Sequence, residues 1–317
     1  MTEPRIPAAG HNRSLWFGGY LAVSLGAFAR PLWELLRLSL SQDTYSHIVL
    51  IPFVSAGLVW MRSPKRAGEP QIPSRALGAA VFAAGLAILG LNWRFGTILL
   101  DGSALSLTIL SLLFVVWAGV LYLYGARTFH ANLFPLLFLL LFVPLPRALV
   151  DQCIRWLQNG SSDVTYALFR LTGTPVLRHG NLFAVPQFTI EVAKECSGIR
   201  SAVAMFITCL LAGYLFLRSS WARLALLAAA MPMLVIKNGI RIVTLTLLSI
   251  HVDPGFLSGR LHHEGGFLFF LVGLVILWPV LLWLQKLEAK QGYPRGGRGK
   301  PASGNSHTGA ATPIPHS

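Results

Sequence analysis

Long apolar stretches follow one another along most of the chain, separated by short segments that hold polar residues, proline or glycine. A helix needs about 17–25 mainly apolar residues to cross a bilayer, and several of the stretches have that length. The pattern predicts about eight transmembrane helices, at residues 15–36, 46–61, 76–93, 103–124, 131–145, 201–217, 222–250 and 265–284. The second and fifth are short for a full crossing, which leaves the count open by one or two.

We therefore expect an all-α polytopic membrane protein with a single transmembrane domain over residues 15–285. Residues 1–14 are expected to form a cytoplasmic N-terminus, and residues 286–317 a disordered basic cytoplasmic tail. The first apolar run ends at Arg30 and Pro31 without the small-residue pattern of a signal-peptide cleavage site. It is expected to remain as the first helix.

The segment between the fifth and sixth predicted helices differs from the rest. Apolar residues recur at helical spacing over residues 147–171, which predicts an amphipathic helix packed on the bundle at the membrane interface. Glycine, proline and alternating β-branched residues then predict a short extended or hairpin element on the extracytoplasmic side. This element leads to Cys196.

The composition excludes two broad classes of protein. With 54% hydrophobic and 12% charged residues, the chain is too apolar for an ordinary soluble domain, whose charged fraction is about 25%. The net charge of +14 is compatible with nucleic-acid binding, but the cations are interleaved with membrane segments and do not gather on one aromatic surface. We expect membrane lipid, and no nucleic acid, as a partner.

The basic loops predict the orientation in the membrane. A cytoplasmic N-terminus places the Lys- and Arg-bearing short loops on the cytoplasmic side, in agreement with the positive-inside rule. The same count places residues 146–200 and 251–263 outside, so the protein is expected to be a multi-pass protein of the plasma (inner) membrane with both termini in the cytoplasm. The cations behind this assignment are Arg62, Lys65, Arg66, Arg75, Arg127, Arg218, Arg223, Lys286, Lys290, Arg295, Arg298 and Lys300.

One cysteine of three has an activating sequence environment. Cys196 precedes the sixth predicted helix, where unsatisfied backbone N–H groups and the positive end of the helix dipole favour a thiolate. Arg200 is expected to share its helical face and to add positive potential. Cys153 and Cys209 are interpreted as small apolar residues.

Arg241 is a cation inside an otherwise lipid-compatible helix, which costs about 2.5–3.5 kcal/mol unless it faces the bundle interior. Asn238 and Thr244 lie three residues on either side and are expected to form a polar stripe with it, whereas Lys237 is a like charge that needs its own partner. A structural arginine paired with a buried carboxylate is the alternative. Acidic residues are scarce in the predicted spans, which favours a site role for Arg241.

His262 and His263 precede the last predicted helix, on the same outer face as Cys196. Histidine is the usual proton shuttle near neutral pH. An interfacial histidine, or a metal site with Glu264, is the alternative. A cysteine, an arginine and a histidine on one leaflet are sufficient for acyl transfer without a cofactor or metal.

These residues resemble the exosortase/archaeosortase family of membrane sorting enzymes. The resemblance covers about residues 45 to 285. Its main signature is the Cys196-Ser197-Gly198-Ile199-Arg200-Ser201 run, then Asn238-Gly239-Ile240-Arg241, then His262 followed by Gly266 and an aromatic. It is extended by Tyr45-Ser46-His47, Pro144-Leu145-Pro146, Gly173-Thr174-Pro175-Val176 and Arg178-His179-Gly180-Asn181.

The resemblance implies a cysteine transpeptidase that recognises secreted proteins by a C-terminal sorting signal. Such a signal is a short Pro-Glu-Pro-like motif, a hydrophobic helix and basic residues. In this reading Cys196 is the nucleophile, His262 the general acid/base and Arg241 the stabiliser of the thiolate or oxyanion. Arg200, Asn238, Ser197 and His263 are possible supporting residues, and the acyl acceptor is unknown.

Two other classes of function compete with this interpretation. In a transporter or channel, Arg241 and Lys237 would line an anion path and the cysteine would be incidental. In a polysaccharide export system, the chain would be a subunit without catalysis. A Cys196→Ala variant that kept full cellular function would favour either of them.

Overall fold

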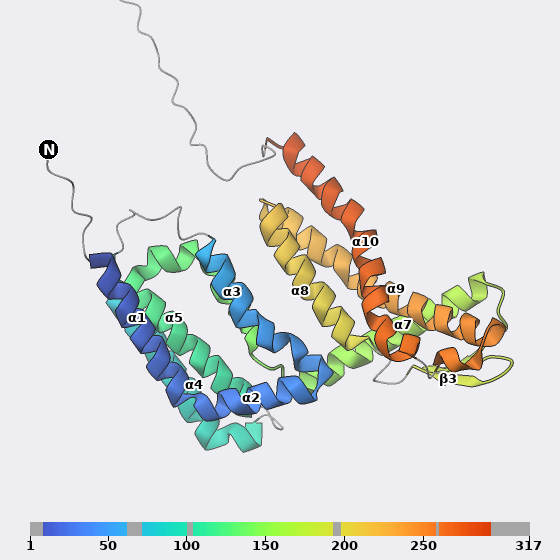
Figure 1. Ribbon diagram of the computed structural model, residues 1–317, viewed down its shortest axis with the longest axis horizontal. Helices are drawn as coiled ribbons and strands as arrows, with labels where there is room; N and C mark the ends of the chain where they lie inside the picture. The colour runs from blue at the N-terminus through green and yellow to red at the C-terminus, as the bar shows by residue number, and fades with distance from the viewer. Residues whose placement is uncertain (1–8, 62–71, 100–103, 193–197, 258–259, 293–317) are drawn as a thin grey trace, which may run out of the picture.

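The computed structural model describes residues 9–61, 72–99, 104–192, 198–257 and 260–292. These residues form helices and one small sheet, and the labels below follow the chain (Figure 1). The helices are α1 Ala9–Ala27, α2 Ala29–Ser41, η1 Asp43–Leu50, α3 Ile51–Trp60, α4 Arg75–Leu99, α5 Ala104–Ala131, α6 Leu133–Phe138, η3 Leu139–Phe142, α7 Arg147–Leu171, α8 Ile199–Phe216, α9 Ser220–His251, η5 Pro254–Leu257 and α10 Arg260–Lys290; the strands are β1 Leu177–His179, β2 Leu182–Ala184 and β3 Thr189–Glu191.

Five helices in the described part of the chain are long and apolar enough to cross a membrane, namely α4, α5, α8, α9 and α10. A sixth is added if Leu133–Phe142 and Arg147–Leu171, which meet at a bend of 92°, count as one broken span. The chain is therefore a polytopic helical membrane protein. The predicted count of eight is not confirmed.

The predicted spans and the observed helices differ most in the N-terminal segments. The predicted span 15–36 is divided into α1 and α2, which begins at Ala29, directly before Arg30 and Pro31. The predicted span 46–61 consists of the 3-10 helix η1 followed by α3, an α-helix of only 10 residues. At the other end, α10 continues to Lys290, five residues beyond the predicted end of the domain at residue 285.

The helices form two groups that lie side by side (Figure 1). In the first group α4 packs along α5, and Gly78 and Gly85 allow the approach: a Cβ at either position would meet α5 atoms at 2.9–3.0 Å. In the second group α7, α8 and α10 pack around α9. A Cβ at Gly239 of α9 would lie 2.5 Å from Val164 of α7. Small residues at such crossings let helix backbones pack closely in a membrane.

The three strands form an antiparallel sheet in the order β1-β2-β3, with Phe183 of β2 opposite Ile190 of β3. Phe183 is fully buried and packs against Phe169 of α7, with ring centroids 6.1 Å apart. Val192 and Ile242 complete this cluster. The sheet is thereby fixed to α7 and α9, directly before the segment that contains Cys196.

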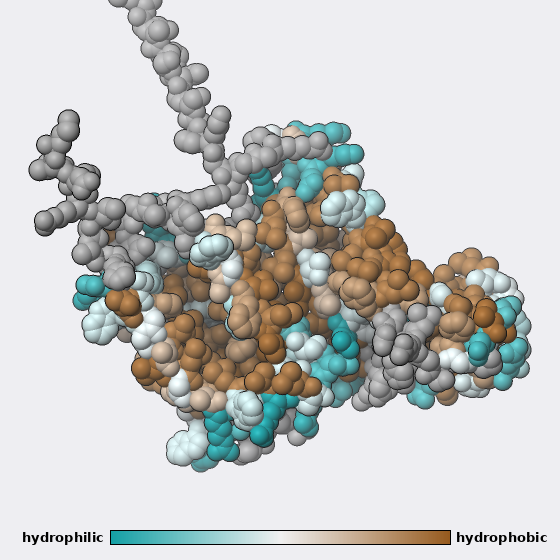
Figure 2. Space-filling view, viewed as in Figure 1, coloured by the Kyte–Doolittle hydropathy of each residue, from teal (hydrophilic) through white to brown (hydrophobic). Residues whose placement is uncertain are grey.

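Hydrophobic residues cover much of the outer surface of both helix groups, whereas hydrophilic residues gather at the ends of the helices (Figure 2). Trp93 of α4 is 92% exposed, and Leu224 of α9 is 66% exposed. Apolar side chains of this size favour contact with lipid.

Candidate functional site

The structure describes some of the predicted site residues and not others. Cys196 and Ser197 lie outside the described residues, and the described chain resumes at Gly198. His262 and His263 lie in the first turn of α10, and their side chains are outside the described part. Gly198, Arg200, Asn238 and Arg241 are described. They show what surrounds the chain that follows Cys196.

Gly198 is the N-cap of α8 and has a φ of +71°, in the left-handed region that glycine adopts most easily. A Cβ at this position would lie 2.8 Å from Oδ1 of Asn238 and 3.6 Å from Nζ of Lys237. Position 198 therefore needs glycine for two reasons, conformation and space. The absence of a side chain lets the start of α8 lie close to the polar part of α9.

Lys237 is the most deeply buried cation among the described residues, with 2% exposure. Its Nζ donates a hydrogen bond of 2.5 Å to Oγ of Ser201, and Ser201 donates to the carbonyl oxygen of Gly198 at 3.0 Å. The aliphatic part of Lys237 lies beside Gly273 of α10. The hydrogen-bond partner expected for Lys237 is thus the hydroxyl of Ser201, in the first turn of α8.

Asn238 and Arg241 follow Lys237 on α9. Asn238 is 1% exposed and donates through Nδ2 to Oγ of Ser161 on α7 at 3.0 Å. Arg241 is half-buried and lies three residues on, Thr244 lies three residues after Arg241, and all three residues are within α9. The predicted polar stripe faces α7 at its Asn238 end.

Arg200 has a partner that the sequence did not indicate. Its guanidinium pairs with the carboxylate of Asp43 in η1 at 3.1 Å, and the two side chains are 65% and 78% exposed. Cys196 lies outside the described residues, so the helical face predicted to be shared by Cys196 and Arg200 stays a prediction. Arg200 links α8 to the first helix group, and it does not point into the polar cluster on α9.

The packing of α9 on α10 shows how far along the bundle the first turn of α10 lies from Lys237. Gly273 lies beside Lys237, and His262 precedes Gly273 by eleven residues. At 1.5 Å per residue, the first turn of a straight α10 lies about 16 Å along the helix from Gly273. The described residues therefore bring Gly198, Ser201, Lys237 and Asn238 together, and they place the first turn of α10 further toward the end of the bundle.

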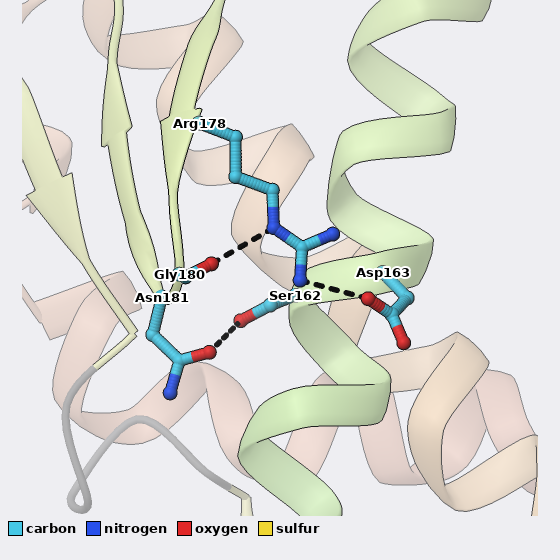
Figure 3. A network of polar contacts seen from close by, with 5 residues as sticks. All are labelled: Ser162, Asp163, Arg178, Gly180 and Asn181. Carbon is cyan, nitrogen blue, oxygen red and sulfur yellow. Dashed lines mark hydrogen bonds and ion pairs between the residues drawn. The ribbon is translucent and has the colours of Figure 1, made fainter.

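Sequence reasoning missed how the sheet is attached to the site. Arg178 of β1 donates through Nε to the carbonyl oxygen of Gly180 at 2.8 Å and contacts Asp163 of α7 at 2.7 Å (Figure 3). Ser162 of α7 donates to Oδ1 of Asn181 at 2.9 Å. The polar run from Ser161 to Asp163 within α7 was the available signal.

Two adjacent serines on α7 thus form hydrogen bonds to two different elements. Ser161 accepts from Asn238 of α9, and Ser162 donates to Asn181 at the β1–β2 turn. Helix α7 therefore connects the polar stripe of α9 with the sheet that leads to Cys196. The residues from Arg178 to Asn181, noted in the sequence as a family-like motif, fix the sheet on this helix.

The molecule is a multi-pass helical membrane protein with buried polar and cationic side chains where its late helices meet. More specifically, the chain belongs to the transmembrane exosortase family, whose model matches residues 13–279. No curated protein and no solved structure matches the chain.

Proposed function

We propose that the protein is a membrane-embedded cysteine peptidase that acts as a transpeptidase on secreted proteins with a C-terminal sorting signal. It cleaves the signal at the outer leaflet of the plasma (inner) membrane and transfers the new C-terminus to a surface acceptor. One observation supports this most directly. Two residues after Cys196, Gly198 allows the chain to lie close to the buried Lys237 and Asn238 of α9, and Lys237 binds Ser201 in the first turn of α8.

The proposal assigns a residue of the protein to each chemical step of cleavage and transfer. The Cys196 thiolate attacks the scissile carbonyl, and the tetrahedral oxyanion is stabilised by the cations of α9, with Arg241 as the principal one. Collapse breaks the C–N bond, and His262 donates a proton to the leaving amine. The thioester is then attacked by a nucleophile of the acceptor, whose proton returns to His262, and the thiolate leaves.

The covalent chain limits how far Cys196 lies from this cluster. Consecutive Cα atoms are about 3.8 Å apart, so the Cα atom of Cys196 lies within about 7.6 Å of that of Gly198. This limit keeps the Cα atom of Cys196 near the start of α8, where Nζ of Lys237 binds Ser201. An ionisable residue buried in a membrane helix is by default a candidate for a functional site, which supports the assignment.

The test is a comparison of three cysteine variants on one client. A secreted reporter ends in a Pro-Glu-Pro motif, a hydrophobic helix and basic residues, and its C-terminus is identified by mass spectrometry. Cys196→Ala should abolish cleavage, whereas Cys153→Ala and Cys209→Ala should leave it largely intact. Normal processing and cellular function in the Cys196→Ala variant would contradict the proposal and would favour a transporter or a non-catalytic export subunit.

A further inference from the structure

An apolar cavity of about 300 Å³ lies between the two helix groups, close to the start of α8. It is lined by residues of η1, η3, α7, α8 and α9. Cys153 and Trp156 of α7 line it and are exposed, so the cavity reaches the surface of the protein. The polar cluster of α9 does not use this space.

One face of α8 looks into the cavity. Its lining residues are Ile199, Ala202, Val203, Phe206 and Ile207. They recur at intervals of three and four and therefore form a single helical stripe about 12 Å long. The stripe begins three residues after Cys196 in the sequence and runs away from it along α8.

Two contacts bound the space beside this stripe. Near the start of α8, Arg200 pairs with Asp43 of η1. Near its end, the ring of Tyr214 stacks on Phe134 of α6, with centroids 3.7 Å apart. Between these two bridges the helix groups stand apart, and α8 presents apolar side chains to the opening.

We propose that this cavity binds the hydrophobic helix of the client, with one face of that helix inserted between the two groups. The proposal rests on the proposed function and adds the place where the client binds. In the client the hydrophobic helix follows the scissile bond, just as α8 follows Cys196. A client helix that starts at the bond therefore runs parallel to α8 and meets its apolar stripe from the first turn.

The volume limits how the helix enters. A 12 Å length of helix about 10 Å wide occupies roughly 900 Å³, three times the cavity. The cavity therefore accepts the side chains of one helix face, and the rest of the client helix stays in lipid. Recognition of a helix by side chains at positions i, i+3, i+4 and i+7 has this form.

Crosslinking from the native Cys153 tests the contact without any catalysis. The enzyme carries Cys196→Ala and Cys209→Ala, so that Cys153 is its single cysteine. The reporter described above has no cysteine except one, which is moved residue by residue through its hydrophobic helix. Oxidation in membranes should give disulfides with Cys153 at every third or fourth position near the start of that helix.

The matched control moves the enzyme's cysteine to the lipid-facing surface. Cys153→Ala combined with Leu86→Cys places it on α4, where Leu86 is 49% exposed. This variant should give no periodic crosslinks. Equal crosslinking at all client positions, crosslinking no stronger than from Leu86→Cys, or none at all would overturn the proposal; the last is the result expected if a lipid chain fills the cavity.

A second variant tests the consequence for processing. Val203→Trp fills the cavity in an enzyme that retains Cys196, and it should raise KM for the reporter at least tenfold with a smaller change in kcat. Leu86→Trp is its control, and thermal unfolding in detergent shows that both fold. Unchanged KM in Val203→Trp would contradict the proposal. Crosslinks without cleavage by the unmodified enzyme would instead contradict the proposed function alone.

Discussion

The cations of α9 show which part of the candidate site the sequence predicts and which part depends on tertiary structure. Arg241 stood out in the sequence because a lone cation in an apolar helix is costly. Lys237 appeared there only as a complication. Its partner Ser201 lies 36 positions away, and Gly198 permits the approach that brings them together. Sequence spacing along one helix gives no information about a partner on another, so this part of the site was not predictable.

Replacement of Lys237 by methionine should separate function from stability. Methionine has a similar length and removes the cost of burying an ammonium group, while Ser201 keeps its own hydrogen bond to the carbonyl oxygen of Gly198. Lys237→Met should therefore keep the unfolding temperature and lower the rate of client processing by roughly 10²-fold, the size typical for loss of one charge-stabilising donor. The rate is measured in membranes against Lys286→Met, an exposed lysine at the other end of the bundle. Equal rates in the two variants would show that Lys237 is structural.

The two histidines of α10 make a second test at this scale. Neighbouring residues on a helix point about 100° apart, so only one of His262 and His263 faces the site. We expect His262→Ala to lower processing by about 10²–10⁴-fold, as loss of a general acid/base does, and His263→Ala to cost much less. Cleavage of one reporter is measured side by side in both variants. A dead His263→Ala variant would reverse the assignment, and two active variants would require another base.

At the scale of elements, the sequence predicted where each long helix lies, because apolar runs and helical spacing leave a continuous signal, but some helix ends differ from the prediction by five to seven residues. The prediction at 201–217 corresponds to Ile199–Phe216, and the amphipathic helix at 147–171 to Arg147–Leu171. It failed where a span is assembled from short pieces. The 3-10 geometry of η1 and the break between α1 and α2 depend on packing, and single-sequence hydropathy does not distinguish them from a continuous helix.

Glu288 provides a test of how the late helices are joined. This carboxylate is 4% exposed and accepts hydrogen bonds from the backbone N–H groups of Arg218 and Ser219 and from the Ser219 hydroxyl, at the N-terminus of α9. Hydrogen bonds to a charged acceptor contribute about 1.5–3 kcal/mol, and the helix dipole favours a negative charge at this end. Glu288→Ala should therefore lower the unfolding temperature in detergent by several degrees.

The control for Glu288 is Glu34→Ala, which removes an exposed carboxylate that pairs with Arg30 four residues away. Exposed pairs of this kind contribute about 0–1 kcal/mol, so the unfolding temperature should change little. A Glu288→Ala variant no less stable than Glu34→Ala would mean that α10 does not fix the turn between α8 and α9.

At the scale of the whole molecule, the two helix groups differ in the predicted site residues that they carry. The predicted site residues whose side chains the structure describes, Arg200, Asn238 and Arg241, belong to the second group, from α7 to α10. The first group reaches that half through Asp43, which pairs with Arg200, and through Tyr45, whose hydroxyl donates to the carbonyl oxygen of Leu145 before α7. A further contact is the ring of Phe134 on α6, which stacks on Tyr214 of α8. The first group therefore shapes one side of the cavity and leaves the polar cluster to the second.

The arrangement of the helix ends predicts the orientation in the membrane. The start of α1, the end of α8 and the end of α10 lie on one side of the molecule, and β3 lies on the other (Figure 1). Basic residues near the first side, such as Arg218, Arg223 and Lys290, favour the cytoplasm. Three candidate spans, α8, α9 and α10, follow the sheet, and an odd number of crossings predicts opposite compartments for the sheet and the end of α10.

Reporter fusions should show this opposition directly. A reporter after Ser317 is expected to be active only in the cytoplasm, and one inserted between Gly173 and Pro186 only outside. The insertion should be placed at the β1–β2 turn, because Gly180 has a φ of +63° and open space around it, so the turn tolerates added chain better than the buried Phe183. Alkylation of a His179→Cys variant by an impermeant maleimide, in a Cys153→Ala and Cys196→Ala background, gives an independent readout without the insertion. If both reporters and the maleimide place the sheet in the cytoplasm, the proposed cleavage at the outer leaflet fails, because Cys196 follows the sheet without an intervening span.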